Sequence, residues 1–217
     1  MFNHKSIDVL DLGINNISSV VSGLMTAAPH VNVNVVAGPG EASASPSMTV
    51  LPGNGSFGAG MGALNGTGLG NYLKDLAAAR EPIFGICLGL QLLFDSSEEA
   101  PGVQGLGLIS GEVRRLPIIS NTGLQTNIGW APLSANWSSL SQLKFEPLLR
   151  DVYFVHSYYV DPEFQEDIIL ESRYENFAFA AAVKRQKTIG VQFHPEKSSN
   201  SGIEIIKSVV EWAFAKD

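Results

Sequence analysis

Several features that would place this 217-residue chain in other protein classes are scarce. A single cysteine cannot form an internal disulfide, which favours a reducing compartment and predicts a cytoplasmic protein. No apolar run approaches the roughly 18 residues of a membrane-spanning helix, and the N-terminal stretch M-F-N-H-K-S-I-D has no secretory apolar core. We therefore expect neither a membrane span nor a membrane partner.

Basic residues and metal ligands are scarce as well. The formal net charge is −7, and the longest basic clusters are the pairs Arg114-Arg115 and Lys184-Arg185, which argues against a nucleic-acid partner. Four histidines and one cysteine are too few and too scattered for a zinc site. We expect no metal and no cofactor.

The composition is that of a globular protein with a substantial core. Hydrophobic residues make up 45% of the chain and charged residues only 16%. The length suits one sizeable domain, and neither an internal repeat nor a flexible linker divides it. A single domain over residues 1–217 is the prediction.

Strand-like and helix-like patterns alternate in the first half of the chain. The expected strands cover 6–12, 31–37, 48–51 and 83–86, and the expected helices cover 17–25 and 67–79. Such alternation predicts a three-layer α/β/α fold with a mainly parallel central sheet. The glycine-rich residues 55–70 contain no G-K-[ST] phosphate signature, and we predict a loop there whose backbone approaches a ligand.

The second half is rich in strands and turns, which predicts an added antiparallel region at one edge of the sheet. The expected strands are 113–116, 125–133, 152–160, 168–174, 177–183 and 189–193. Residues 136–151 read as a connecting segment with room for a short helix. A final amphipathic helix over 201–215 is predicted to bury Ile203, Ile206, Val210 and Phe214.

The stretch P-I-F-G-I-C-L-G-L-Q-L-L-F, residues 82–94, carries the chemical signal. An apolar strand pattern ends at Cys87, glycines lie two residues before and after it, and a helical pattern follows. This G-x-C-x-G arrangement is the thiol form of the nucleophile elbow. Amide N–H groups at the start of the helix would favour a thiolate and hold an oxyanion. The alternative is an inert cysteine that acts as a small buried hydrophobe.

A second motif, His194-Pro195-Glu196, follows the last predicted strand. Extended backbone places residues i and i+2 on the same side, so both side chains are expected to reach one site. A cysteine nucleophile needs a base, and the base needs a carboxylate to orient it. A strand-end turn with a solvated glutamate is the alternative. His156 in V-H-S-Y-Y is the other candidate base, but we interpret it as a core histidine with satisfied hydrogen bonds.

The segments G-I-C-L-G-L-Q-L-L-F and G-V-Q-F-H-P-E-K-S, with L-P-G-x-G-x-F-G at 51–58, resemble the class I (triad) glutamine amidotransferases. S-E-E-A-P-G-V-x-G-L at 97–106 makes the chain most similar to the glutaminase subunits of imidazole glycerol phosphate synthase, which act in histidine biosynthesis. The resemblance extends from Val9 to about Phe214.

The resemblance implies that Cys87 attacks the side-chain amide of L-glutamine, that His194 protonates the leaving ammonia and then activates water, and that Glu196 orients His194. It implies oxyanion donors in the backbone at Leu88, Gly53 and Asn54. It also implies that Gln91 and Glu99 grip the α-amino and α-carboxylate end of glutamine, with Ser157 and Tyr158 lining the pocket.

The family's ammonia passes to a cyclase of (β/α)8-barrel form, so the resemblance implies a heterodimer. That cyclase makes imidazole glycerol phosphate and AICAR, and its ligand switches on glutamine hydrolysis. The residues expected to face the partner are Asn15, Asn16, Trp130 and Lys197.

Three segments depart from the family pattern. P-G-N-G at 52–55 replaces P-G-V-G, N-I-G-W-A at 127–131 replaces H-M-G-W-N, and G-I-N-N at 13–16 replaces G-x-G-N. The chemical residues are intact while expected partner-facing residues differ. Three alternatives stay open: an amidotransferase that supplies ammonia for amidation of a surface-polysaccharide sugar, a freestanding cysteine hydrolase, and a non-catalytic regulatory subunit.

Overall fold

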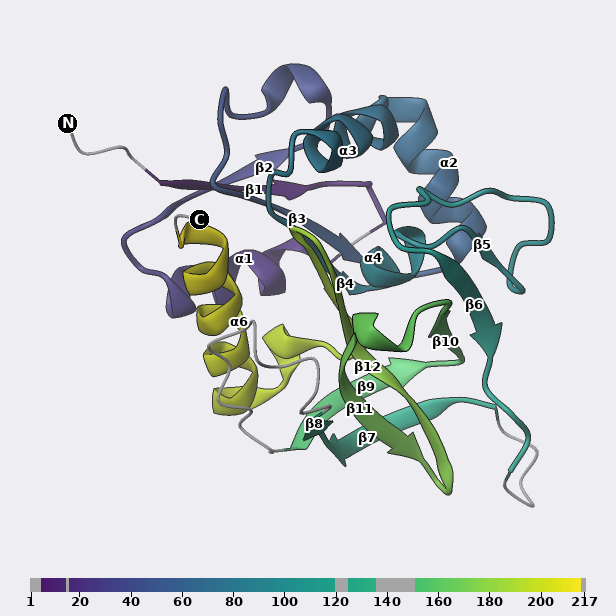
Figure 1. Ribbon diagram of the computed structural model, residues 1–217. Helices are drawn as coiled ribbons and strands as arrows, with labels where there is room; N and C mark the ends of the chain where they lie inside the picture. Colours follow the sequence, from purple (N-terminus) through teal and green to yellow (C-terminus); the bar gives the residue numbers. More distant parts are fainter. Residues whose placement is uncertain (1–4, 15, 120–124, 136–150, 216–217) are drawn as a thin grey trace.

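A computed structural model describes residues 5–14, 16–119, 125–135 and 151–215 (Figure 1). The predicted connecting segment at 136–151 lies almost wholly outside the described residues. In the described part of the chain, the central sheet has eight strands in the spatial order β2-β1-β3-β4-β13-β12-β11-β8. The first five are mutually parallel, and β12, β11 and β8 are antiparallel. The predicted α/β fold with an antiparallel edge is confirmed.

The strands of this sheet are mostly apolar because both faces are covered. Their bounds are β1 Ser6–Leu10, β2 Asn32–Val36, β3 Met48–Gly53, β4 Ile83–Cys87, β8 Ser134–Ala135, β11 Ile168–Tyr174, β12 Phe177–Arg185 and β13 Thr188–Val191. The strands β3, β4 and β13 are buried along their whole length, so these three strands form the centre of the hydrophobic core.

Helices form the two outer layers (Figure 1). One face carries α1 (Ile17–Ala27) and α6 (Ser199–Phe214), which pack against each other. The other face carries α2 (Phe57–Thr67), α3 (Leu69–Ala78) and α4 (Leu88–Leu92). Along α6 the most buried large side chains are Ile205, Ile206, Val209 and Val210. The prediction is therefore correct for Ile206 and Val210. Ile203 and Phe214 are only half-buried and lie at the margin of the apolar face.

Two smaller sheets extend from this body. One contains β10 (Tyr158–Pro162), β6 (Gly111–Arg115) and β5 (Ser96–Ser97), and the other pairs β7 (Asn127–Pro132) with β9 (Asp151–His156). The predicted single strand over 152–160 is therefore wrong. The chain breaks at Ser157, because β9 pairs with β7 while β10 pairs with β6 in a different sheet. Short 3₁₀ turns occur at Pro39–Glu41 (η1), Gln165–Asp167 (η2) and Pro195–Lys197 (η3).

The predicted loop over the glycine-rich residues is also wrong, because residues 57–67 form α2. The Ser56 hydroxyl caps the helix by accepting the N–H of Ala59, and Phe57, Met61 and Leu64 bury one side of it. Each glycine costs about 1 kcal/mol of helix propensity, but burial of these three side chains offsets the loss. At Gly60 a Cβ atom would lie 2.9 Å from Leu92 Cδ1, so the small residue lets α2 approach α4.

In the part of the chain that the structure describes, no helix is long and apolar enough to cross a bilayer.

Candidate active site

The predicted nucleophile lies at the tip of a strained strand-to-helix turn. Cys87 is the last residue of β4, and it adopts φ 53° and ψ −108°, a conformation that non-glycine residues rarely occupy. A Cβ atom on Gly89 would collide with the carbonyl oxygen of Leu51, and one on Gly85 would lie 2.9 Å from the backbone N of Leu90. The flanking glycines are therefore required by close packing, and the predicted elbow is present.

Parallel pairing brings three strand ends together at this turn. Gly53, at the end of β3, pairs with Cys87, and Val191, at the end of β13, pairs with Ile86. The segment that carries His194 thus leaves the sheet beside the cysteine. The three strand ends therefore converge at the edge of the sheet where ligands bind in parallel α/β folds.

Backbone hydrogen bonds fix the position of His194. Its N–H donates to the Tyr153 carbonyl at 2.9 Å, and its carbonyl accepts the Ser198 hydroxyl at 2.6 Å. The same hydroxyl oxygen accepts the Tyr153 N–H at 2.9 Å. Since Ser198 is fully buried, this clamp ties the end of β13 to β9 and leaves the His194 backbone little freedom.

His194 and Glu196 meet as a buried pair. Nδ1 of His194 lies 2.7 Å from Oε1 of Glu196, and the two side chains are 5% and 4% exposed. A carboxylate only accepts, so Nδ1 carries the donated proton and Nε2 is left for the cysteine side. The predicted extended backbone holds at His194, but residues 195–197 form the 3₁₀ turn η3, which folds Glu196 back onto the ring.

The charge state of His194 reflects its two neighbours. Burial lowers its pKa, but the hydrogen-bonding and negative charge of Cys87 and Glu196 outweigh burial and raise the pKa to about 10. Nε2 is buried, and among the described residues no atom meets the geometry of a hydrogen bond with it. Cys87 is nevertheless close enough to raise the pKa of the ring. A protonated imidazole beside the sulfur can give its proton to a leaving group.

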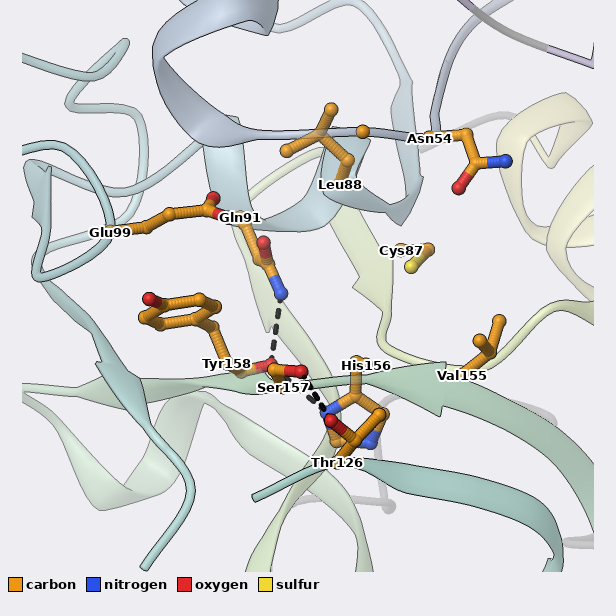
Figure 2. Close-up of a pocket in the computed structure, with 11 residues that line it drawn as sticks. Asn54, Cys87, Leu88, Gln91, Glu99, Thr126, Val155, His156, Ser157 and Tyr158 are labelled. Carbon is orange, nitrogen blue, oxygen red and sulfur yellow. Dashed lines mark hydrogen bonds between the residues drawn. The ribbon is translucent and has the colours of Figure 1, made fainter. Parts of the chain in front are cut away.

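A pocket of about 270 Å³ opens beside the sulfur of Cys87 (Figure 2). This volume is close to the lower end of small-molecule sites, roughly 300 Å³, and suits a ligand of amino-acid size. Its walls are formed by Asn54, Gly55, Cys87, Leu88, Gln91, Glu99, Thr126, Val155, His156, Ser157 and Tyr158. The four residues predicted to bind the substrate all belong to this set.

Two of the predicted substrate residues are held by hydrogen bonds. Gln91 is 5% exposed, and its Nε2 donates to the Tyr158 carbonyl at 3.0 Å. The Oε2 atom of Glu99 accepts the N–H of Phe57, the first residue of α2, at 2.7 Å. Both side chains therefore present oxygen acceptors from fixed positions, as an ammonium group requires.

The opposite wall is built from the junction of β9 and β10. The Ser157 and Thr126 hydroxyl oxygens lie 2.8 Å apart. His156 Nδ1 donates to the Tyr158 carbonyl at 2.9 Å, which leaves Nε2 to accept from Asn127 Nδ2 at 3.1 Å. Burial lowers the pKa of His156 to about 4, the carbonyl contact opposes this shift, and His194 adds to it. His156 is thus a neutral histidine with both nitrogens satisfied, as expected, and it also forms part of the pocket wall.

The predicted oxyanion residues lie around the elbow. Asn54 and Leu88 line the pocket with Cys87. Gly53 packs against the following turn, where a Cβ atom would lie 2.6 Å from the Gly89 backbone N, and it lines a much smaller cavity beside His194 and Glu196. Its role as a donor remains a prediction.

The expected partner-facing residues lie apart from the pocket. Trp130 is 52% exposed on β7, with one ring edge against Tyr153, and its strand neighbour Ile128 is 64% exposed. Lys197 is exposed, and Asn16 accepts a hydrogen bond from the Ser18 hydroxyl. Asn15 lies outside the described residues.

Sequence patterns did not identify Thr126, Val155 or Gln192 as part of the site. Thr126 and Val155 reach the pocket through the β7–β9 pairing, which no local pattern encodes. Gln192 follows directly after the end of β13, and its approach to Cys87 depends on the pairing of β13 with β4. Within the described ranges no cluster of three or more His, Cys, Asp or Glu side chains could hold a metal ion.

Comparisons with known proteins identify the family of this chain. The family model "Glutamine amidotransferase class-I" matches residues 8–211. The chain is 41% identical to imidazole glycerol phosphate synthase subunit HisH of Gloeobacter violaceus, covering all of this chain and 93% of that protein. It is 37% identical to the subunit of the same name from Moorella thermoacetica, covering 95% of each. The structure of PurLQS from Thermotoga maritima superposes with a TM-score of 0.71 over 97% of both chains, and at 16% identity this likeness concerns the fold alone.

Proposed function

Because this chain belongs to the class I glutamine amidotransferase family and resembles its HisH-type members, we propose that it hydrolyses L-glutamine with a Cys87-His194-Glu196 triad. We further propose that the ammonia passes to a cyclase subunit that makes imidazole glycerol phosphate and AICAR. The observation that carries the proposal is the buried His194–Glu196 pair beside a strained cysteine that opens into a pocket of amino-acid size.

The geometry suggests the following sequence of steps. The Cys87 sulfur attacks the side-chain carbonyl carbon of glutamine, and N–H groups near Leu88 and Asn54 hold the oxyanion. The C–N bond then breaks while His194 Nε2 gives its proton to the departing nitrogen, so ammonia leaves and a thioester remains. His194 next takes a proton from water as the hydroxide attacks the thioester carbon. The C–S bond then breaks, which releases glutamate and restores the Cys87 thiolate beside protonated His194.

Within the pocket, Gln91 and Glu99 offer oxygen acceptors to the α-ammonium end of the substrate. Ser157 and Tyr158 line the same pocket. The exposed apolar side chains of β7 support a docking role for this strand, so we propose a heterodimer with a (β/α)8-barrel cyclase. Lys197, which is exposed, is a second candidate contact.

The decisive experiment measures glutamate release from L-glutamine by the chain alone and with a histidine-pathway cyclase plus its nucleotide ligand. The proposal predicts strong stimulation when both are present and loss of at least about 1,000-fold in Cys87→Ala. No release by the parent chain under either condition would contradict it and favour a regulatory subunit. The Asn54 departure is the feature that favours that reading, although backbone N–H groups, which do not depend on the side chain, are the proposed donors.

A second candidate is an amidotransferase that supplies ammonia to a sugar-amidation partner. The altered segment Asn127–Ala131 favours it, since β7 exposes this segment while the triad is intact. Glutamate release that ignores the cyclase, yet is lost in Cys87→Ala, would support this candidate over the histidine pathway.

A further inference from the structure

Gln192 is a fully buried polar residue that the triad does not include. It has no solvent-exposed surface, and its backbone N–H donates to the Ala181 carbonyl at 2.9 Å. Because β13 runs parallel to β4 with Val191 opposite Ile86, the next residue along, Gln192, stands beside Cys87. A buried carboxamide is costly unless its hydrogen bonds are made, so its contacts define its function.

The contacts of Gln192 form an ordered chain of donors and acceptors. Nε2 of Gln91 donates to the Tyr158 carbonyl at 3.0 Å, and a carbonyl can only accept, so the orientation of the Gln91 carboxamide is fixed. The same Nε2 donates to Gln192 Oε1 at 3.3 Å. This contact in turn directs Nε2 of Gln192 to the sulfur of Cys87, 3.9 Å away.

We propose that Gln192 stabilises the thiolate of Cys87 by donating an N–H to its sulfur, and that Gln91 holds Gln192 in the donating orientation. This role deepens the proposed function, on which it rests, by adding a second polar group at the reacting sulfur. The chain also leaves Oε1 of Gln91 as the acceptor of that carboxamide toward the pocket. One relay of hydrogen bonds therefore orders both the nucleophile and a substrate-binding atom.

A donor at this position matters because Cys87 is buried, with only 6% of the residue exposed. A buried anion relies on the few donors that surround it, and each one favours the ionised form. The titratable groups that face Cys87 are His194 at the end of β13 and, across the pocket, Glu99, His156 and Tyr158. Gln192 does not titrate, so its contribution does not itself change with pH.

The test follows alkylation of Cys87 by iodoacetamide as a function of pH, in which an S–C bond forms and iodide leaves. In Gln192→Met the donor is lost, and we expect the pH of half-maximal alkylation rate to rise by about one unit. Gln192→Glu keeps the size and the acceptor for Gln91 but replaces the donor with a carboxylate, so a rise of at least the same size is expected. The matched control is Gln125→Met, because Gln125 Nε2 donates to the Leu116 carbonyl at 2.9 Å, away from the sulfur, and its half-maximal pH should equal that of the parent.

Circular dichroism of each variant separates this outcome from loss of the fold, and Gln192→Glu carries the test if Gln192→Met does not fold. The proposal would be overturned if the folded Gln192 variants reached their half-maximal alkylation rate at the same pH as the parent. An equal rise of that pH in Gln125→Met would overturn it as well. The alkylation readout does not require glutamine hydrolysis. The role of Gln192 and the proposed glutaminase activity can therefore fail separately.

Discussion

The site at the strand ends and the outer strand β7 lie close together in the fold, but they differ in how far their side chains are exposed to solvent. At the site, Cys87, His194 and Gln192 are each at most 6% exposed and are held by neighbours on several elements. On β7, Ile128 and Trp130 are more than half exposed. The buried side chains of the site have little freedom to vary, whereas the exposed side chains of β7 have few constraints from the fold. One of the three departures from the family pattern, N-I-G-W-A at 127–131, falls on that strand.

A side-chain hydrogen bond links the two regions. Asn127, on β7, donates to Nε2 of His156, which lines the pocket from β9. The next residue along β7 is the exposed Ile128. A partner that docks on β7 thus lies one residue away from the pocket wall.

The largest effect is expected where the elbow is most tightly packed. In Gly89→Ala the added methyl group collides with the Leu51 carbonyl, so the free energy of unfolding should fall by about 3 kcal/mol or more. The matched control is Gly62→Ala in α2, where nothing lies within 4 Å of the new methyl group. That change should stabilise the protein by about 0.5–1 kcal/mol. Urea unfolding of both variants tests the contrast, and equal stabilities would show that the elbow is not rigid.

The next effect concerns the orienting carboxylate. Glu196→Gln removes the charge that helps to raise the pKa of His194, while the side chain keeps its size. We expect kcat for glutamine hydrolysis to fall by about 100-fold, because general acid catalysis at His194 weakens. Glu211→Gln, on the exposed side of α6, is the control and should retain the parent rate. An unchanged kcat in Glu196→Gln would remove Glu196 from the mechanism.

Low pH should destabilise the protein through His156, which lines the pocket next to β7. The folded pKa of His156, about 4, lies below its ordinary value of 6.5, so the unfolded chain binds a proton first as the pH falls. The stabilisation is present above about pH 6.5 and is lost toward pH 4, with a limit of about 3 kcal/mol. His156→Gln should reduce this loss, which urea unfolding at pH 7 and pH 4.5 measures in both proteins. The same loss in parent and variant would mean that other groups cause the acid sensitivity.

Sequence patterns predicted the elbow and the His194–Glu196 pair because both depend on residues within a few positions of one another. Residues 57–67 misled the prediction because intrinsic glycine propensity argues for a loop, while packing of Phe57 and Met61 against the body of the fold decides for a helix. The break at Ser157 and the approach of Gln192 to Cys87 depend on which strands pair. Such long-range pairing is a property of the whole sheet and leaves no local signature.

The smallest effect on the chain itself is expected on β7. Trp130→Ala removes a half-exposed ring that touches Tyr153 by one edge, so the free energy of unfolding should change by less than about 1 kcal/mol. Binding to the proposed cyclase partner should weaken much more, by about 10-fold or greater, because tryptophans are frequent binding hot spots. Calorimetric titration measures the affinity, and Ile118→Ala, at an apolar side chain that is 67% exposed outside β7, is the control. Equal losses of affinity in the two variants would mean that general apolar exposure, rather than β7, determines docking, and the contrast between a fixed site and an adaptable strand would then have to be drawn elsewhere on the surface.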